Sequence, residues 1–325
     1  MYLPPKLRCA ATMFGMLVLA CGCSAPRRPA ALVRHEYAQL HMGVQARLIV
    51  YAPSTDEGEL AAKVAYSRVA ELEDIASDYR PTSELMRLCA RAGQGPVKVS
   101  DELFTMLSHA QEVARRSGGA FDVTVGPYVR LWRAARKAKQ LPSPEALAEA
   151  RQLVGWEKVK LDAENRTVEL TAPGMRLDLG GIAKGYAGDE AIRVLREHGV
   201  RSALFEAGGD IVVSDAPPGA KGWEIEIPDH LNGSTQFIYV VNRGVSTSGD
   251  TEQFLEIDGK RYSHVVDPRT GIGLTSRHEA TVVAPNGLTS DPLSTAASVL
   301  GLEGYKFVKS FPGARPYLGC RAEAR

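Results

Sequence analysis

The chain has 325 residues, of which 39 are Lys or Arg and 38 are Asp or Glu, so its formal net charge is +1. This balance excludes a basic field over the whole chain, and we expect no nucleic-acid partner. The length allows a sizeable core in one or two domains. The five cysteines do not form a metal-binding pattern, because the only close pair is Cys21 and Cys23 near the N-terminus.

The first residues have the layout of an export signal. Lys6 and Arg8 precede an apolar run over 10–20, which is too short to span a bilayer as a stable helix. The run ends in Val18-Leu19-Ala20-Cys21, which is similar to a lipobox, the bacterial signal whose cysteine is lipidated and becomes the new N-terminus.

We therefore predict a signal peptide over 1–20, lipidation at Cys21, and a lipid anchor and tether over 21–40. The alternatives are lipidation at Cys23, a plain cleaved signal peptide, or a short membrane-attached helix. A lipid anchor would hold the protein at the bacterial inner membrane, facing the periplasm or the cell exterior.

Strand and helix signals follow from residue 45. The segment 45–52 alternates like a strand, and an amphipathic helix follows to about residue 78, with Leu60 among the side chains expected to face the core. Ser83 and Ser100 are predicted N-caps of two further helices, the second of which ends at Gly118. The basic residues over 133–139 are expected to form a solvated face.

The segment 177–187 predicts a strand, a tight turn and a helix. Gly180 and Gly181 allow a tight turn or a close approach, and helical spacing runs from Ala183 to a stop at Gly199. The free amides of a helix start, together with Lys184, would suit a phosphate group. An ordinary strand-to-helix turn with a solvated lysine is the alternative.

Strands dominate the second half of the chain. They are predicted over 203–206, 223–227, 237–241, 253–257, 261–266 and 279–284, and a helix is predicted over 291–300. Helices combined with mostly antiparallel or mixed sheets predict an α+β fold, and no convincing linker divides the globular part.

Asp291 and Thr295 are candidate metal ligands. On a helix they are four residues apart, so a carboxylate and a hydroxyl would lie on one face, one turn apart. Mg²⁺ accepts such oxygen donors and takes its remaining ligands from water and substrate phosphate. Helix capping by Asp291 and burial of Thr295 are the alternative.

Two other sets of side chains are candidates for chemistry. His264 lies near the end of the strand predicted over 261–266 and could accept a proton from a hydroxyl nucleophile, although a hydrogen bond to Asp267 would give it a purely structural role. Met42, Tyr79 and Phe121 each lie beside a turn, where they could pack on a flat ring. Core packing is the alternative for all three.

Taken together, these segments resemble the ApbE family of FAD:protein FMN transferases, many of which are bacterial lipoproteins. The matching segments keep the family's order and span roughly 41–305: His41 to Gly43, Tyr79 to Glu84, Gly119 to Pro127, Asp178 to Ala187, Gly208 to Ile211, Thr247 to Asp250, Ser263 to Gly271 and Asp291 to Thr295.

The resemblance implies an ApbE-like fold and a transferase domain over 41–325. Its activity would be Mg²⁺-dependent transfer of FMN from FAD, as substrate, to a Ser or Thr hydroxyl of an acceptor protein, releasing AMP. The acceptor would be a membrane-bound or exported redox subunit. A flavin-binding lipoprotein without transfer, an FAD pyrophosphatase giving FMN and AMP, and a generic solute-binding lipoprotein are the alternatives.

The resemblance also implies roles for residues by position. Met42 and Tyr79 would sandwich the isoalloxazine ring, and His264 would be catalytic, with Asp250 in reserve. Other cofactor contacts would be Ala120, Phe121, Asp122, Gly180, Tyr186 and Val265, with Lys184 added by its charge. The metal would be held by the Ala183 carbonyl, the Asp291 carboxylate and the Thr295 hydroxyl, with Ser294 adjacent.

One departure from the family pattern affects this metal site. Ser290 and Pro292 flank Asp291 where the family usually has alanine on both sides. A proline in the first turn of a helix is tolerated, so we expect the ligand to be retained.

Overall fold

The computed structural model describes residues 31–229, 234–249, 254–276 and 278–320. The predicted signal peptide, the lipidation site Cys21 and the reserve catalytic residue Asp250 lie outside the described residues. Within those ranges, no helix is both long and apolar enough to cross a membrane.

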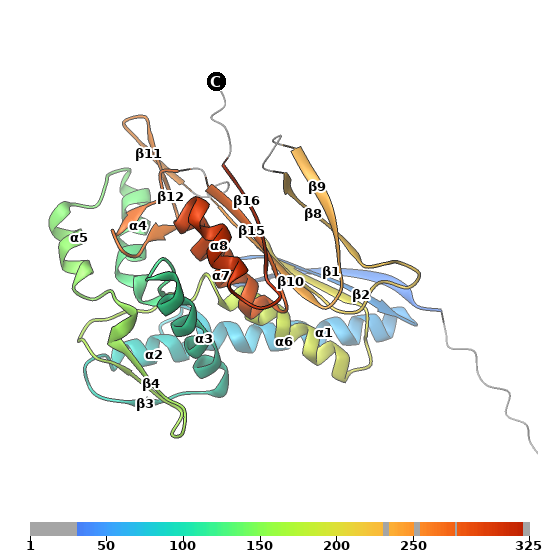
Figure 1. Ribbon diagram of the computed structural model, residues 1–325. Helices are drawn as coiled ribbons and strands as arrows, with labels where there is room; N and C mark the ends of the chain where they lie inside the picture. The colour runs from blue at the N-terminus through green and yellow to red at the C-terminus, as the bar shows by residue number, and fades with distance from the viewer. Residues whose placement is uncertain (1–30, 230–233, 250–253, 277, 321–325) are drawn as a thin grey trace, which may run out of the picture. The chain divides into compact units, whose positions relative to one another are not determined.

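A seven-stranded antiparallel sheet organises the fold (Figure 1). Its strand order is β1-β2-β6-β7-β10-β15-β16, and each neighbouring pair is antiparallel. The strands are β1 (Val33–His41), β2 (Val44–Ala52), β6 (Ala203–Ala207), β7 (Asp210–Val213), β10 (Arg243–Ser248), β15 (His278–Ala284) and β16 (Arg315–Cys320). Together with the helices described next, the sheet confirms the predicted α+β class.

The two faces of the sheet are covered differently because side chains alternate along each strand. In β2, Leu48 and Val50 pack with α1 (Thr55–Ala76) and α6 (Ala183–Glu197). Ile49 points to the other face, against β8 (Trp223–Asp229) and β9 (Ser234–Val240). The helix α7 (Gly287–Leu300) lies on the α6 side, in contact with β10 and β15.

The predicted core face of α1 was wrong at Leu60, which is 60% exposed. Its neighbours Ala61, Ala62 and Ala65 are buried instead. These small side chains allow α1 to pack closely on the sheet and on α6, and this contact rotates Leu60 outward.

The remaining elements form smaller sheets and flanking helices. They are α2 (Glu84–Ala90), β3 (Val97–Lys98), α3 (Asp101–Ser117), η1 (Val123–Val125), α4 (Gly126–Ala138), α5 (Pro144–Arg151), η2 (Trp156–Lys158), β4 (Val159–Asp162), β5 (Thr167–Leu170), β11 (Phe254–Ile257), β12 (Lys260–Ser263), β13 (Val266–Asp267), β14 (Ile272–Gly273), η3 (Gly301–Glu303) and α8 (Gly304–Lys309). The predicted caps are confirmed: Ser83 and Ser100 accept amide hydrogen bonds at helix starts, and Gly118 ends α3 in the left-handed conformation.

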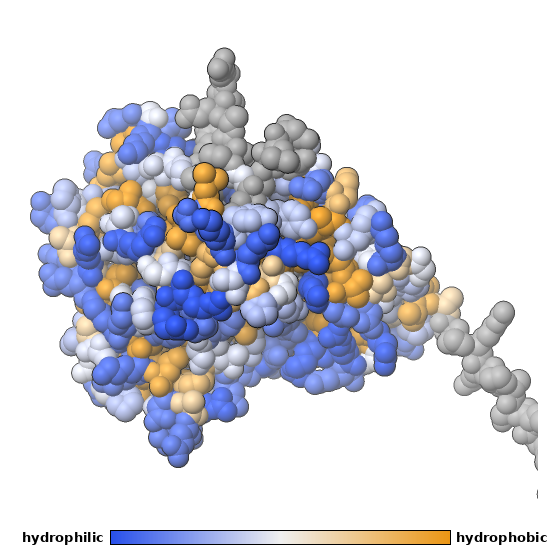
Figure 2. All heavy atoms as spheres, viewed as in Figure 1, coloured by the Kyte–Doolittle hydropathy of each residue, from blue (hydrophilic) through white to orange (hydrophobic). Residues whose placement is uncertain are grey.

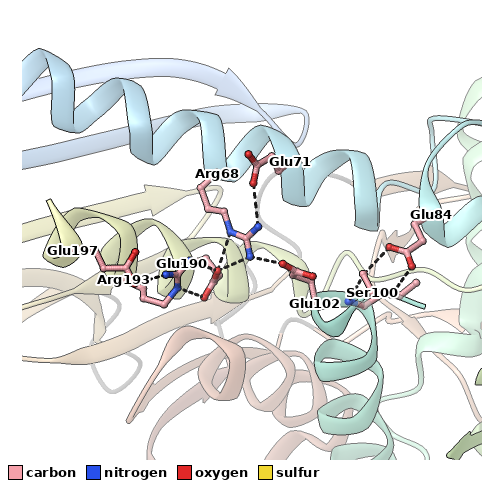
Figure 3. A network of polar contacts seen from close by, with 9 residues as sticks. Arg68, Glu71, Glu84, Ser100, Glu102, Glu190, Arg193 and Glu197 are labelled. Carbon is pink, nitrogen blue, oxygen red and sulfur yellow. Dashed lines mark hydrogen bonds and ion pairs between the residues drawn. The ribbon is translucent and has the colours of Figure 1, made fainter. Parts of the chain in front are cut away.

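A charged network joins α1, α3 and α6 (Figure 3). The Arg68 guanidinium lies 2.6 Å from a Glu190 carboxylate oxygen and 2.7 Å from one of Glu102. All three side chains are at most about one quarter exposed. Because one guanidinium serves carboxylates on two other helices, the network fixes α6, which carries part of the site, against α1 and α3.

Polar side chains cover most of the face shown in Figure 2, and apolar side chains gather there in separate patches. Large exposed apolar residues of the described chain belong to different elements, including Leu40 in β1, Phe237 in β9 and Leu302 in η3. Isolated apolar side chains of this kind are ordinary for a protein surface.

Candidate active site

The turn before α6 is more tightly bonded than the sequence predicted. Among the described residues, the segment 176–179 pairs with no strand, and α6 begins at Ala183 without a side-chain cap. The Gly180 amide donates to Asp178 Oδ1 at 2.8 Å, and the Ile182 and Ala183 amides donate to the Leu179 carbonyl. The prediction that these amides are free to bind phosphate is therefore wrong.

Gly181 and Gly185 of this segment are explained by close approaches rather than by unusual backbone angles. A Cβ on Gly181 would lie 3.0 Å from the Thr295 hydroxyl oxygen. A Cβ on Gly185 would lie 2.1 Å from the Gly287 carbonyl oxygen, far inside a normal contact. The helices α6 and α7 consequently meet backbone to backbone, which places Asp291 and Thr295 beside the start of α6.

Two carboxylates lock this crossing of α6 and α7. Asp189 on α6 accepts the Gly287 and Leu288 amides at the start of α7, both at 2.7 Å. In the opposite direction, Asp291 on α7 accepts the Gly185 amide at 3.1 Å. Burial raises the pKa of Asp189 to about 6, although the two amide donors oppose the rise.

Lys184 occupies a different environment from the one predicted. Its Nζ lies 2.9 Å from Asp210 Oδ2, 3.9 Å from Asp291 Oδ2, and donates to the Gly180 carbonyl at 2.8 Å. Burial alone would lower the pKa of Lys184, but Asp210 and Asp291 outweigh burial and hold it above its usual value. The ammonium is thus engaged with two carboxylates rather than standing free for a phosphate.

The Asp291 carboxylate is buried beside a second carboxylate, that of Asp210. Its residue is only 3% exposed, and burial followed by repulsion from Asp210 raises its pKa to about 7, against the attraction of Lys184. Two buried carboxylates therefore share one ammonium. This surplus of negative charge favours a further cation at Asp291.

The surroundings of Asp291 supply oxygen donors for such a cation. Thr295 lies one helical turn along α7 at the cavity wall, and Ala183 is buried at the start of α6. Ser294 is less available, because its hydroxyl donates to the Asp291 carbonyl at 2.8 Å. In the part of the chain that the structure describes, no three His, Cys, Asp or Glu side chains gather as a metal site. The ligand set that combines Asp291 with hydroxyl and carbonyl oxygens stays a prediction.

The position of Pro292 differs from the prediction. Helix α7 begins at Gly287, capped by the Asn286 side chain, so Pro292 lies inside the helix rather than in its first turn. A proline there removes one helical hydrogen bond. Asp291 nevertheless stays helical, because Asn286 and Asp189 both stabilise the start of α7.

Two adjoining cavities open beside this cluster. The acidic cavity has a volume of about 440 Å³ and its lining includes Phe121, Asp210, His264, Asp291 and Thr295. The Met42 cavity has a volume of about 480 Å³ and its lining includes Met42, Val44, Ala76, Leu179 and Ala183. Both volumes are typical of small-molecule sites. The residues that border both cavities are Tyr79, Arg133, Asp178, Gly180, Lys184, Gly208 and His264.

Most predicted cofactor contacts line these cavities. Ala120, Phe121, Asp122 and Val265 line the acidic cavity. Asp122 accepts hydrogen bonds from the Thr124 amide and hydroxyl, and burial raises its pKa to about 6.

His264 is exposed at the border of both cavities, in the bend after β12. The strand predicted over 261–266 ends at Ser263 instead, because the Ser263 hydroxyl accepts the Val265 amide at 3.0 Å and closes a turn around His264. The histidine therefore lies outside the core, where a substrate in either cavity could reach it.

Tyr186 is a predicted contact that the geometry does not support. It lines neither cavity and packs instead against the apolar core. Burial raises its pKa to about 12, followed by the effects of Glu190 and Glu102, which belong to the network of Figure 3. On the α6 helix, Tyr186 thus points away from the side that carries Lys184.

Met42 and Tyr79 border the Met42 cavity from two separate turns. Met42 joins β1 to β2 with a left-handed backbone, φ 51°, followed by Gly43 at φ 76°. Tyr79 follows α1 and is 73% exposed. Its large exposed ring beside a cavity agrees with the predicted role as a platform for a flat ligand.

Arg133 was missed by the sequence analysis, which treated it as part of a solvated face. It forms ion pairs with Asp78 and Asp178, and its guanidinium carbon lies 4.1 Å from the centre of the Tyr79 ring. Asp210 also had no predicted role. The only signal for Asp210 in the sequence was its position after Gly208-Gly209 at the end of a predicted buried strand. Arg133 had no such signal, because nothing distinguished it from the other basic residues of its segment.

Comparison with known proteins decides the family. Residues 42–318 match the ApbE family. The chain belongs to this family. A FAD:protein FMN transferase of Treponema pallidum is 34% identical over 95% of this chain and 91% of its own length, and one of Haemophilus influenzae is 33% identical over 76% of both chains.

Solved structures agree with this ApbE membership. The ApbE protein of Thermotoga maritima is 30% identical, with a TM-score of 0.79 over 89% of this chain and 94% of its own. The flavinyl transferase ApbE of Pseudomonas stutzeri, in its apo form, is 28% identical, with a TM-score of 0.78 over 90% and 92%. These findings confirm the ApbE fold and a FAD:protein FMN transferase that takes FAD as substrate and a protein as acceptor.

Proposed function

We propose that this ApbE protein transfers FMN from FAD to a Ser or Thr hydroxyl of an exported or membrane-bound redox protein, in a Mg²⁺-dependent reaction that releases AMP. The observation that carries the proposal is that the Asp291–Thr295 face of α7 and His264 line one cavity. That cavity adjoins the one bordered by Met42 and Tyr79.

The residues that would hold Mg²⁺ are Asp291, Thr295 and the Ala183 carbonyl. Their oxygens are hard donors, and the surplus carboxylate of the Asp210–Asp291 pair supplies the negative charge that such a cation needs. Bound Mg²⁺ would neutralise charge on the pyrophosphate oxygens of FAD. Lys184 would hold Asp210 and limit its repulsion of Asp291.

The flavin end of FAD would occupy the Met42 cavity. Met42 and Tyr79 would contact the two faces of the isoalloxazine ring, and the apolar side chains of Val44 and Leu179 support an aromatic occupant. Ala120, Phe121, Asp122, Gly180 and Val265 would contact the rest of the substrate along the acidic cavity.

The transfer itself needs no covalent bond to this protein. The acceptor oxygen would attack the phosphorus of the FMN half, forming a phosphoester, while the bond to the bridging pyrophosphate oxygen breaks and AMP leaves with that oxygen. His264 would accept the proton of the acceptor hydroxyl, since its exposure allows a protein segment to reach it. Asp250 remains the reserve base.

A lipid at Cys21 would place this chemistry on the outer side of the inner membrane. The support is the sequence alone: a basic start, an apolar run of eleven residues over 10–20 and a lipobox-like end. Mass measurement of the mature N-terminal peptide tests this placement. A diacylglycerol adduct on Cys21, lost in Cys21→Ser, supports it, whereas an unmodified N-terminus after cleavage contradicts it.

Incubation of the mature chain with FAD, Mg²⁺ and a redox domain that carries a Ser or Thr acceptor tests the reaction. We expect a covalent FMN adduct on the acceptor by mass, and equimolar AMP. Asp291→Ala should abolish the Mg²⁺-dependent adduct, and His264→Ala should slow its formation about 10²- to 10⁴-fold while FAD still binds. Free FMN with AMP and no adduct would indicate a pyrophosphatase instead.

A further inference from the structure

We propose that Arg133 is a positioning residue that holds the Tyr79 ring as the flavin platform and ties it to the Gly180 turn. This inference rests on the proposed placement of the flavin against Tyr79. It adds a residue from α4, a helix in which the sequence indicated only a solvated basic face.

The contacts of Arg133 join two segments that are far apart in the sequence. Asp78 lies between the end of α1 and Tyr79. Asp178 lies two residues before Gly180, in the turn that leads into α6. Arg133 forms an ion pair with Asp78, and its guanidinium lies 3.1 Å from Asp178 Oδ2. The Asp178 side chain accepts the Gly180 amide through its other oxygen, at 2.8 Å.

The same guanidinium also packs against one face of the Tyr79 ring. Its central carbon lies 4.1 Å from the ring centre, a distance typical of a cation–π contact. Because Tyr79 is 73% exposed, the protein does not otherwise enclose the ring. The guanidinium thus covers one face and leaves the other available for a flat ligand.

Burial of these charges makes the arrangement rigid. The side chains of Asp178, Asp78 and Arg133 are 11%, 18% and 26% exposed. Burial and then repulsion from Asp78 raise the pKa of Asp178, whereas the Arg133 guanidinium opposes this rise by attracting the carboxylate. A planar guanidinium can serve both carboxylates and stack on the ring at the same time, which a lysine ammonium cannot do.

The position of Arg133 at the border of both cavities gives this rigidity a function. Movement of Tyr79 would displace the flavin end of FAD, and movement of Asp178 would displace the turn that leads to Ala183 and Lys184. One side chain therefore fixes the position of the flavin platform relative to the turn that leads to Ala183 and Lys184.

The test compares Arg133→Met, Arg133→Lys and the control Arg130→Met in the mature chain. Arg130 is exposed on the same helix and lines neither cavity. The measurements are quenching of flavin fluorescence on FAD binding, KM for FAD and kcat for adduct formation, and the midpoint of thermal unfolding.

We expect Arg133→Met to raise KM for FAD about tenfold and to lose most of the flavin quenching, with a smaller change in kcat. Compared with Arg133→Met, Arg133→Lys should recover more of the wild-type unfolding midpoint than of the wild-type flavin quenching. Arg130→Met should match the wild type in all measurements. Arg133→Met with wild-type KM and quenching would overturn the inference, as would a lowered unfolding midpoint alone. If Arg133→Met does not fold, unchanged quenching in Arg133→Lys overturns it.

These outcomes separate the inference from the proposed function. Absence of an adduct with the wild-type chain contradicts the transfer reaction, whatever Arg133 does. An active wild type with unaltered FAD binding in the Arg133 variants contradicts only the role of Arg133.

Discussion

Replacement of Asp291 by asparagine should stabilise the metal-free protein while abolishing its metal-dependent activity. The carboxylate is buried beside Asp210, and its pKa rises from 3.8 to about 7. The neutral amide has nearly the same shape and can still accept the Gly185 amide, which Asp291 now accepts at 3.1 Å. Lys184 keeps its closer partner, Asp210, at 2.9 Å.

The size of this stabilisation follows from the pKa of Asp291. A pKa that is raised by one pH unit on folding corresponds to about 1.4 kcal/mol, so ionised Asp291 lowers the free energy of unfolding by up to about 4 kcal/mol. Below pH 3.8 the carboxyl is protonated in both states and costs nothing. The cost grows as the pH rises from 3.8 to about 7 and is complete above that range.

The assay is denaturant unfolding of both proteins in a chelator at pH 5 and pH 8. Asp291→Asn should exceed the wild type by about 4 kcal/mol at pH 8 and by about 1–2 kcal/mol at pH 5. Added Mg²⁺ should then stabilise the wild type but not Asp291→Asn. The control Glu149→Gln removes the same charge from an exposed position on α5 and should change neither value by more than about 0.5 kcal/mol.

A less stable Asp291→Asn at pH 8 without metal would refute this reasoning. It would mean that Lys184 stabilises the Asp291 carboxylate by more than burial and Asp210 destabilise it.

Three further substitutions test the crossing of α6 and α7 and the limits of the site. Asp189→Ala removes the acceptor of the Gly287 and Leu288 amides and should lower the free energy of unfolding by about 2–3 kcal/mol and weaken Mg²⁺ binding, as measured by denaturant unfolding and metal titration. Gly185→Ala forces the helices apart, since its Cβ would lie 2.1 Å from the Gly287 carbonyl oxygen, and should cost about 3 kcal/mol or more by the same assay. Tyr186→Phe should leave the Kd for FAD unchanged, because Tyr186 lines neither cavity.

Each of these has a contrary result. Tight Mg²⁺ binding by a folded Asp189→Ala would show that α7 needs no help from α6 to place Asp291. Wild-type stability of Gly185→Ala, compared with Glu197→Ala at the exposed end of α6, would contradict the contact between the helix backbones. A large loss of FAD affinity in Tyr186→Phe would restore the contact that the resemblance implied.

Local signals predicted most elements because they act over a few residues. Ser100 and Gly118 mark the two ends of α3, since a hydroxyl acceptor and a left-handed glycine have no requirement beyond the helix itself. The spacing of Asp291 and Thr295 likewise predicted a shared helical face, which depends only on the helical repeat.

Contacts between distant segments could not be read in this way. Arg133 lies 55 residues from Asp78 and 45 from Asp178, and its own segment looks like any basic surface helix. Lys184 was expected to be free because the sequence does not show that Asp210 and Asp291 converge on it. The side of α6 on which Tyr186 lies is likewise set by packing against α1, a contact that the sequence around Tyr186 does not show.

The contact between α6 and α7 also limits how this site can change. No side chain separates Gly185 from Gly287, so the main chains of α6 and α7 meet directly there, and the Asp189 and Asp291 carboxylates hold the two helices in this contact. Any larger residue at Gly185 or Gly287 would push the helices apart at a high cost in stability, so substitution there cannot adjust the distance in small steps for a larger cation. Altered metal preference would have to come from the donors themselves, such as Thr295, and the crossing is the part of the enzyme least open to gradual redesign.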